Sequence, residues 1–175
     1  GIQIAGIFNY AKQVNGSQLG LINIADSVNG WNLGLINIIL KGKHSIDFST
    51  NELNTFSISY KSGTNKMYNI FQAGGNPFEG SKSLHIGYGL GSEILIKKRW
   101  AFVQEAIAST IHAGNWNDQN IAIRYQPMVQ FSITSLMRIY AGPTFNILYH
   151  EKSKTYEGFA VPFETKYPSF ELNNK

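Results

Sequence analysis

Few residues in this 175-residue sequence could support catalysis or hold a metal ion, and those few are far apart. The four histidines stand at positions 44, 85, 112 and 150, and Asp47, Glu52 and Glu105 are carboxylates without an evident partner. Catalysis by side chains requires a nucleophile beside a base, a pair of carboxylates or a cluster of metal ligands. The sequence offers no such arrangement, so we predict a non-enzymatic protein without catalytic residues, metal ligands or cofactors.

His85 and Glu93 come closest to a ligand pair, because both fall on the same face of one predicted strand. They are eight residues apart, which in an extended strand is too far for the two side chains to share one metal ion. The glycines at 87, 89 and 91 alternate within this strand instead of opening a helix, so they form no phosphate-binding loop. We interpret His85 as lining a polar interior and the glycines as relieving crowding there.

The segments that carry these residues alternate strictly between apolar and polar side chains. Between residues 137 and 149, for example, Ile139, Phe145 and Ile147 share one face, and Arg138 and Asn146 share the other. Alternation with a period of two predicts β-strands. The predicted strands cover residues 44–50, 55–61, 66–73, 84–96, 100–112, 120–131 and 137–149. The fold class that follows is all-β.

The connections between the later strands alternate between long and short. Residues 74–83 and 113–119 are long connections, whereas residues 97–99 and 132–136 are short ones. Outer-membrane barrels have short turns at the periplasmic end and longer loops outside. We therefore predict an antiparallel up-and-down β-barrel of the outer-membrane type over residues 43–175.

The chemistry of the polar faces favours such a barrel over a soluble β-sandwich, whose strands would also alternate. A water-exposed sheet face normally carries Lys, Glu and Thr, whereas these faces carry Gly, Gln, Asn, Arg, His and Thr. Charged residues make up only 15% of the chain, which suits a protein whose outside lies largely in lipid. Gln104 and Glu105 depart from the alternation, because two adjacent residues cannot both face the lumen without a β-bulge. The residues that we expect to line the lumen are His85, Glu93, Arg124, Gln126, Gln130, Arg138 and Asn146.

Residues 1–42 form a region of strand-turn repeats before the barrel. The motif Gly-x-x-Asn begins at Gly6, Gly20 and Gly34, a spacing of 14 residues. The turns between the repeats end in Asn-Gly, a dipeptide that tolerates positive backbone dihedrals. Successive repeats are either antiparallel neighbours in a meander or coils of a narrow solenoid in which Gly and Asn stack in ladders. The sequence leaves both geometries open, and also leaves open whether the repeats share the sheet of the barrel.

Charge, cysteine content and hydropathy restrict the class of partner. The net charge is +4, but the basic residues, such as Lys61, Lys66 and Lys97, fall mostly in predicted connections, so we do not predict nucleic-acid binding. The chain has no cysteine, which excludes disulfides and thiolate metal sites. No apolar run approaches the roughly 20 residues of a membrane-spanning helix, so a membrane location would require a barrel.

Three motifs make the chain resemble a known family. They are Gly-Leu-Ile-Asn-Ile-Ala-Asp-Ser-Val-Asn-Gly at residues 20–30, Tyr-Gly-Leu-Gly at 88–91 and Ala-Gly-Pro-Thr-Phe-Asn at 141–146. The chain resembles the surface-repeat outer-membrane β-barrel proteins of Bacteroides-type bacteria, most of which are uncharacterised. The resemblance implies export, an outer-membrane or cell-surface location in a Gram-negative bacterium, and no enzymatic activity. Residues 169–175 do not form the usual final apolar strand, so the barrel either lacks its closing strand or closes differently.

We expect a structural or interaction role, as a surface anchor or as a subunit of an envelope complex. The partners would be outer-membrane lipid and other envelope proteins. Binding residues concentrate on loops held by a rigid scaffold, and Phe78, Trp116 and Asp118 are the candidates in the predicted external loops. The alternative is a soluble β-solenoid joined to a sandwich, exposed at the cell surface, that binds glycan or protein ligands.

Overall fold

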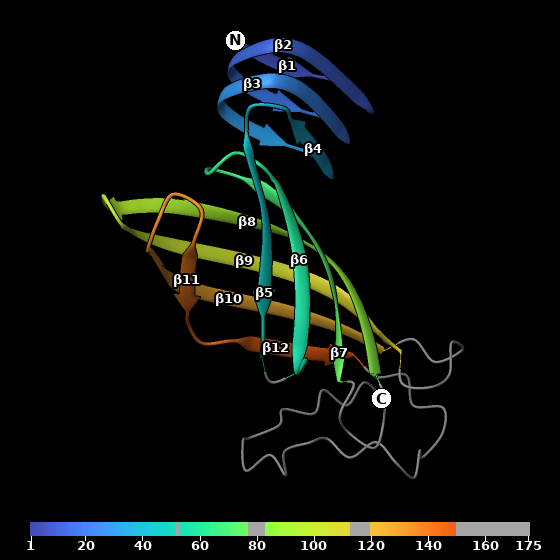
Figure 1. Cartoon of the computed structure of the whole chain (residues 1–175). Helices are drawn as coiled ribbons and strands as arrows, with labels where there is room; N and C mark the ends of the chain where they lie inside the picture. Colours follow the sequence, from blue (N-terminus) through green and yellow to red (C-terminus); the bar gives the residue numbers. More distant parts are fainter. Residues whose placement is uncertain (52, 77–82, 113–119, 150–175) are drawn as a thin grey trace.

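A computed structural model of the chain shows two units built from strands (Figure 1). It describes residues 1–51, 53–76, 83–112 and 120–149. A parallel sheet comes first in the sequence, and a larger antiparallel sheet follows. No helix occurs in the described ranges, so these ranges contain no helix long and apolar enough to span a bilayer. The prediction of an all-β fold is confirmed.

The first unit is a narrow β-solenoid in which each repeat forms one coil; we call it the solenoid. Its strands are β1 (Ile2–Ile4), β2 (Phe8–Leu19), β3 (Ile22–Leu33) and β4 (Ile36–Ile39). β2 and β3 are parallel, with Phe8 beside Ile22 and Asn9 beside Asn23, so each residue pairs with the one 14 positions later. β3 and β4 keep this offset. Of the two geometries that the sequence left open, the repeats thus adopt the solenoid rather than the antiparallel meander.

A ladder of asparagines fills one half of each coil. The Nδ2 atom of Asn9 donates to Oδ1 of Asn23 over 2.9 Å, and Nδ2 of Asn23 donates to Oδ1 of Asn37 over 2.8 Å. Parallel strands in register lie about 4.8 Å apart, which brings identical amide side chains within hydrogen-bonding reach. The other half of each coil is filled by apolar side chains, among them Val14, Ala25 and Ile39. The 14-residue period of the sequence therefore specifies the stacking of the coils.

The second unit is an antiparallel sheet of eight strands. They are β5 (Lys43–Ser49), β6 (Phe56–Gly63), β7 (Tyr68–Asn76), β8 (Ser83–Lys97), β9 (Trp100–His112), β10 (Asn120–Ser132), β11 (Arg138–Ala141) and β12 (Phe145–Tyr149). Consecutive strands pair from β5 to β10, and both β11 and β12 pair with β10. From β5 to β11 each strand therefore pairs with its neighbour in the sequence, as in an up-and-down arrangement, and β12 continues along the same edge of β10 as β11.

This sheet is strongly curled (Figure 1). The Nζ atom of Lys61 in β6 lies 5.1 Å from the ring centroid of Tyr140 in β11, although the sheet order β11-β10-β9-β8-β7-β6 separates the two strands by five spacings. Five spacings in a flat sheet would amount to about 24 Å. The curl thus brings the two ends of the sheet to face each other across its concave side, which we call the inner face. Among the described residues, β5 has no hydrogen-bonded strand partner at its outer edge.

The single strand predicted over residues 137–149 is divided into β11 and β12, so that prediction was wrong in this detail. Both strands keep one register against β10, since Val129 pairs with Ala141 and Tyr125 pairs with Phe145. Continuing this register places Pro143 opposite Pro127. Neither proline has a backbone N–H to donate, so the ladder of hydrogen bonds is interrupted between them.

The adjacent polar residues Gln104 and Glu105 need no bulge in β9. Glu105 faces inward and is 3% exposed, while Gln104 is on the outer face, where its Oε1 accepts a hydrogen bond from the hydroxyl of Tyr125 over 2.9 Å. The pairing of β8 with β9 shifts only between Leu95 and Lys97, beside the tight turn. The hydroxyl of Tyr125 therefore provides a hydrogen-bond partner for Gln104 on the apolar outer face.

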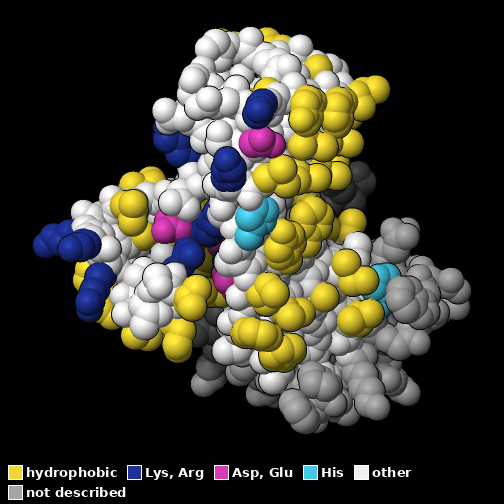
Figure 2. Space-filling model, turned by 45° about the horizontal axis from the view of Figure 1, so that its top comes forward, with side chains coloured by type: hydrophobic (Ala, Val, Ile, Leu, Met, Phe, Trp, Pro, Cys, Tyr) yellow, Lys and Arg dark blue, Asp and Glu magenta, His cyan; other side chains and the backbone are white. Residues whose placement is uncertain are grey.

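The outer face of the sheet is apolar, whereas the inner face carries the buried charged and amide side chains together with a smaller apolar group that includes Ile70, Val103 and Ile107. Large hydrophobic side chains remain exposed on the outer face, including Phe48, Phe56, Ile58, Phe71, Ile86, Ile121, Ile123, Tyr125, Val129, Ile139, Phe145 and Ile147. Figure 2 shows such side chains gathered over the viewed surface. Buried polar residues occupy the alternating positions, including Ser57, Ser59, Lys61, Gln72, His85, Glu93, Glu105, Arg124 and Gln130. This is the reverse of the distribution in a water-soluble sheet, which buries its apolar face.

The solenoid joins the sheet through its last coil, where β4 contacts β6 and β7. The backbone N–H and the Nδ2 atom of Asn37 both donate to Oδ1 of Asn69 in β7, over 3.0 and 2.8 Å. Asn69 in turn donates through Nδ2 to the backbone oxygen of Leu35 over 2.7 Å, and the hydroxyl of Tyr88 in β8 donates to the same oxygen. Asn69 therefore continues the asparagine ladder from the solenoid into the sheet.

Candidate functional site

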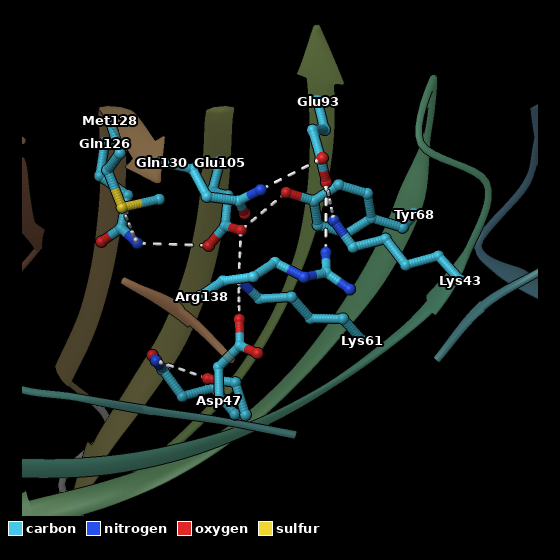
Figure 3. Close-up of polar contacts among 12 residues, drawn as sticks. Lys43, Asp47, Lys61, Tyr68, Glu93, Glu105, Gln126, Met128, Gln130 and Arg138 are labelled. Carbon is cyan, nitrogen blue, oxygen red and sulfur yellow. Dashed lines mark hydrogen bonds and ion pairs between the residues drawn. The ribbon is translucent and has the colours of Figure 1, made fainter. Parts of the chain in front are cut away.

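Ionisable and amide side chains from all strands between β5 and β11 meet on the inner face of the sheet (Figure 3). We call this group the ion network. It consists of Lys43, Asp47, Lys61, Tyr68, Glu93, Glu105, Gln126, Gln130 and Arg138. These residues reach the same place because each falls on an inward position of its strand.

Lys61 forms one centre of the ion network. Its Nζ atom lies 2.6 Å from Oδ2 of Asp47 in β5 and 2.5 Å from Oε1 of Glu105 in β9. The side chains of Lys61 and Glu105 are 5% and 3% exposed, and that of Asp47 is 19% exposed. A buried carboxylate needs such compensation, since an uncompensated charge away from water costs several kcal/mol. Lys61 therefore links three strands by balancing two acidic groups.

Glu93 in β8 forms the other centre. Its Oε2 atom pairs with Nζ of Lys43 and lies 3.7 Å from a guanidinium nitrogen of Arg138. Its Oε1 atom accepts a hydrogen bond from Nε2 of Gln130 over 3.2 Å. Both oxygens of Glu93 are thus bonded, and the contacts come from β5, β10 and β11. Because β5 lies at the opposite end of the sheet order from β10 and β11, Glu93 connects opposite sides of the inner face.

Tyr68 lies between the two centres (Figure 3). Its hydroxyl donates to Oε1 of Glu105 over 2.8 Å, and the ammonium group of Lys43 stands 4.2 Å from its ring centroid, a cation–π distance. The ring has room because its direct partner in β8 is Gly91, where a Cβ would overlap the ring atoms. The expectation that glycines in this strand relieve interior crowding agrees with this contact.

The charges of the ion network balance. The cations Lys43, Lys61 and Arg138 face the anions Asp47, Glu93 and Glu105. The second oxygen of Glu105 also has a partner, since Nε2 of Gln126 lies 3.3 Å away. A network in which every glutamate oxygen is bonded to protein groups makes the interior rigid.

A second polar group occupies the inner face beside the ion network. Arg124 in β10 donates to the side-chain oxygen of Gln72 in β7, and Nε2 of Gln72 donates to the hydroxyl of Ser59 over 3.1 Å. Arg124 is 2% exposed. In β8, Nε2 of His85 lies 3.2 Å from the hydroxyl of Ser83. Of these contacts, the one between Arg124 and Gln72 joins strands that are separated in the sheet order, β10 and β7.

The residues predicted to line the lumen lie partly in the ion network and partly beside it. Glu93, Gln126, Gln130 and Arg138 belong to the ion network, with Arg138 the most exposed of its charged members.

The other predicted residues, His85, Arg124 and Asn146, lie outside the ion network. Asn146 pairs in register with Arg124, which places it on the same inner face, where it is half-buried. The loop candidates Phe78, Trp116 and Asp118 lie outside the described residues. The structure therefore brings the inner-face candidates to one side of the sheet without bringing His85 and Glu93 into contact.

Sequence reasoning missed the central members of the ion network, namely Lys43, Asp47, Lys61, Tyr68 and Glu105. Lys61 was grouped with the basic residues of the connections because it ends the predicted strand 55–61, but it lies within β6 and is buried. A usable signal was present, because Asp47 and Lys61 share the polar side of their strands with serines. The alternation thus assigned both residues to the polar face, but it did not indicate that they would meet Glu105 there.

The contacts of the ion network connect strands of the sheet to one another. Its glutamates are saturated by cations and hydrogen bonds, whereas a catalytic acid or base must be free to exchange a proton with substrate. Across residues 1–51, 53–76, 83–112 and 120–149, no group of three or more His, Cys, Asp or Glu side chains is placed to hold a metal ion. Comparison of the chain with protein-family models, with curated proteins and with solved structures found no match.

Proposed function

We propose that this chain is a small, non-enzymatic outer-membrane β-barrel protein with a structural or interaction role. The observation that carries the proposal is the inverted polarity of the curled sheet. Ile123 is 41% and Phe145 is 59% exposed on the outer face, while Lys61 and Arg124 are almost fully buried on the inner face. Contiguous apolar surface of this extent is rare on soluble proteins. In a bilayer the same arrangement is favourable, because hydrocarbon surrounds the outside.

Strand length and curvature support the same proposal. A strand of about 9 to 11 residues at barrel tilt crosses the hydrocarbon layer. β8, β9 and β10 have 15, 13 and 13 residues, which is sufficient. Irregular or unpaired backbone is unfavourable in lipid, so a spanning sheet must close on itself. The sheet has the curvature that such closure requires, since Lys61 in β6 approaches Tyr140 in β11 across the inner face.

Aromatic residues at the strand ends fit the interfacial girdles of such barrels. Trp100 and Phe131 pack with ring centroids 4.8 Å apart, beside the basic turn that contains Lys98 and Arg99. Tyr149 stands at the other end of the sheet, at the end of β12, and is exposed. Amphipathic rings next to charged turns are favourable where hydrocarbon meets headgroups and water.

The filled interior argues for an anchor or a subunit of an envelope complex rather than an open pore. Small barrels fill their lumen with side chains. Here the ion network spans the inner face from β5 to β11. The partners that follow are outer-membrane lipid and other envelope proteins, and the resemblance to surface-repeat proteins of Bacteroides-type bacteria agrees with that location. Phe78, Trp116 and Asp118 remain the candidates for external binding.

Heat-modifiable gel migration tests the proposal. A folded outer-membrane barrel resists dodecyl sulfate at room temperature, so the unheated protein, refolded in detergent, should migrate differently from the boiled protein. Purification without detergent provides the opposing test. A monodisperse monomer in plain buffer would contradict the membrane location, because the apolar outer face would then be in water.

A further inference from the structure

The solenoid also has an apolar outer side. At the corner of each coil, Ile7, Leu21 and Leu35 form a column with a spacing of 14 residues, and each is more than half exposed. Further exposed apolar residues flank this column, namely Phe8, Tyr10, Leu19, Trp31, Leu33 and Ile38. The repeat therefore presents a continuous apolar surface built from stacked coils, not isolated hydrophobic residues.

Charged and polar side chains avoid this surface. The charged side chains of the solenoid repeats are Lys12, Asp26 and Lys41, which follow the apolar positions along each coil. Exposed polar side chains such as Gln13 and Asn29 occupy the opposite half of the coils. Figure 2 shows charged groups on one side of the solenoid and hydrophobic side chains on another. The solenoid thus has one side suited to water and one that is not.

The interior of the solenoid follows the same inversion. Behind the apolar surface lie buried amides, including Asn23 and Asn32, both 0% exposed. Behind the polar surface lie the apolar side chains of Val14 and Ala25. Amides are thus buried beneath the apolar surface, and aliphatic residues are buried beneath the polar one. The half of each coil that is filled by amides therefore has an apolar outer surface, and exposing that surface to water is unfavourable.

The apolar side of the solenoid continues into the outer face of the sheet. The hydroxyl of Tyr88 bonds to the backbone of Leu35, and the ring of Tyr88 packs edge-to-face on Phe71 with centroids 5.4 Å apart. Phe71 belongs to the exposed apolar side of β7. The column of Ile7, Leu21 and Leu35 thus leads directly to the surface assigned to lipid in the proposed barrel.

From these observations we propose that the apolar side of the solenoid lies in the hydrocarbon of the same bilayer, so that the repeats extend the wall of the barrel instead of projecting into water. This inference rests on the proposed outer-membrane function. Hydrocarbon is the fitting occupant because the surface offers aliphatic and aromatic groups without the polar rim of a protein interface. Continuity with the sheet places that surface beside the same lipid.

Single-cysteine labelling tests the inference, since the natural chain has no cysteine to interfere. Leu21→Cys probes the apolar side of the solenoid, Asn29→Cys probes its polar side, and Phe145→Cys probes the outer face of the sheet. Leu33→Cys is a second probe of the apolar side, should Leu21→Cys not refold. Each variant carries an environment-sensitive fluorophore and is reconstituted in phosphatidylcholine vesicles with or without doxyl-labelled phosphatidylcholine. Heat-modifiable migration checks folding.

We expect doxyl lipid to quench the label at Leu21 to the same extent as the label at Phe145, and to leave the label at Asn29 unchanged. Quenching at Phe145 without quenching at Leu21 or Leu33 would overturn the inference and leave the proposed function standing. Blue-shifted emission at Leu21 that doxyl lipid does not quench would overturn it in favour of a protein covering, such as a second copy. Absence of quenching at all positions would overturn both proposals.

Discussion

The side-chain amide of Asn37 donates to Oδ1 of Asn69 over 2.8 Å, and this bond carries the asparagine ladder of the solenoid into the antiparallel sheet. The two residues come from different units and from different sequence contexts. Asn37 belongs to the 14-residue repeat, whereas Asn69 lies in an alternating strand. The sheet thus supplies the next step of the ladder at the place where the repeat ends.

Replacing Asn69 by leucine should detach the solenoid from the sheet. The substitution leaves the backbone N–H and the amide of Asn37 and the oxygen of Leu35 with fewer partners in a buried place. Each unpaired buried group costs about 1–3 kcal/mol, so we expect a loss of about 2–4 kcal/mol in the free energy of unfolding. Urea titration in detergent measures it. Asn29→Leu, at an exposed position of the solenoid, is the control, and equal losses in both variants would contradict the role of the ladder.

Replacing Lys61 by methionine should destabilise the sheet by about 3–5 kcal/mol, because Asp47 and Glu105 would remain buried without their shared cation. The double variant Lys61→Met with Glu105→Gln should recover part of this loss. Urea unfolding followed by tryptophan fluorescence gives the interaction energy from the double-mutant cycle. Lys66→Met serves as the control at an exposed position. Strict additivity of the two substitutions would show that Lys61 and Glu105 do not act together.

Replacing Gly91 by alanine should cost about 1–3 kcal/mol, because the new Cβ would overlap the ring of Tyr68 and force it out of place. Removing the aromatic ring with Tyr68→Leu in the Gly91→Ala background should relieve the overlap. Gly6→Ala is the matched control, since a Cβ at Gly6 meets no atom within 4 Å. Thermal unfolding in detergent compares the variants. An unchanged midpoint for Gly91→Ala would mean that the ring does not lie against this glycine.

An arginine on the outer face should be far more costly than one on the inner face. Ile123→Arg places a charge at an outward position of β10, and near the midplane of the hydrocarbon the expected cost is about 2–4 kcal/mol. Gln126→Arg, on the same strand, places the charge beside Glu105 and should cost much less. Refolding into phosphatidylcholine vesicles at a series of urea concentrations measures both. Similar costs at the two positions would contradict a lipid-facing outer surface.

The alternation of apolar and polar residues predicted most strands, because this pattern is local to each segment. β10 occupies residues 120–132, against the expected 120–131, because apolar residues such as Ile121, Ile123 and Tyr125 alternate with polar ones and specify an extended strand without reference to its neighbours. The break between β11 and β12 was not predictable in this way. It depends on Pro143 meeting the register of Pro127, and register is a property of two strands rather than one.

The sequence was sufficient to predict which residues share the polar face, but not which of their side chains contact one another. Alternation assigns Glu93, Arg124 and Gln130 to a polar face, yet it does not say which charges meet. Lys61 and Glu105 are 44 residues apart in sequence and lie in strands that are not adjacent in the sheet. Their ion pair exists because the sheet curls, and curling arises from the twist of all strands together.

The strand content, the 14-residue repeat and the separation of apolar from polar faces can be derived from the sequence alone, because these follow from the local alternation of side chains along an extended chain. The tertiary structure decided that the repeats stack in parallel, that the polar face turns inward and that Asn37 meets Asn69. These depend on which distant strands come within about 5 Å of one another, which no local pattern encodes.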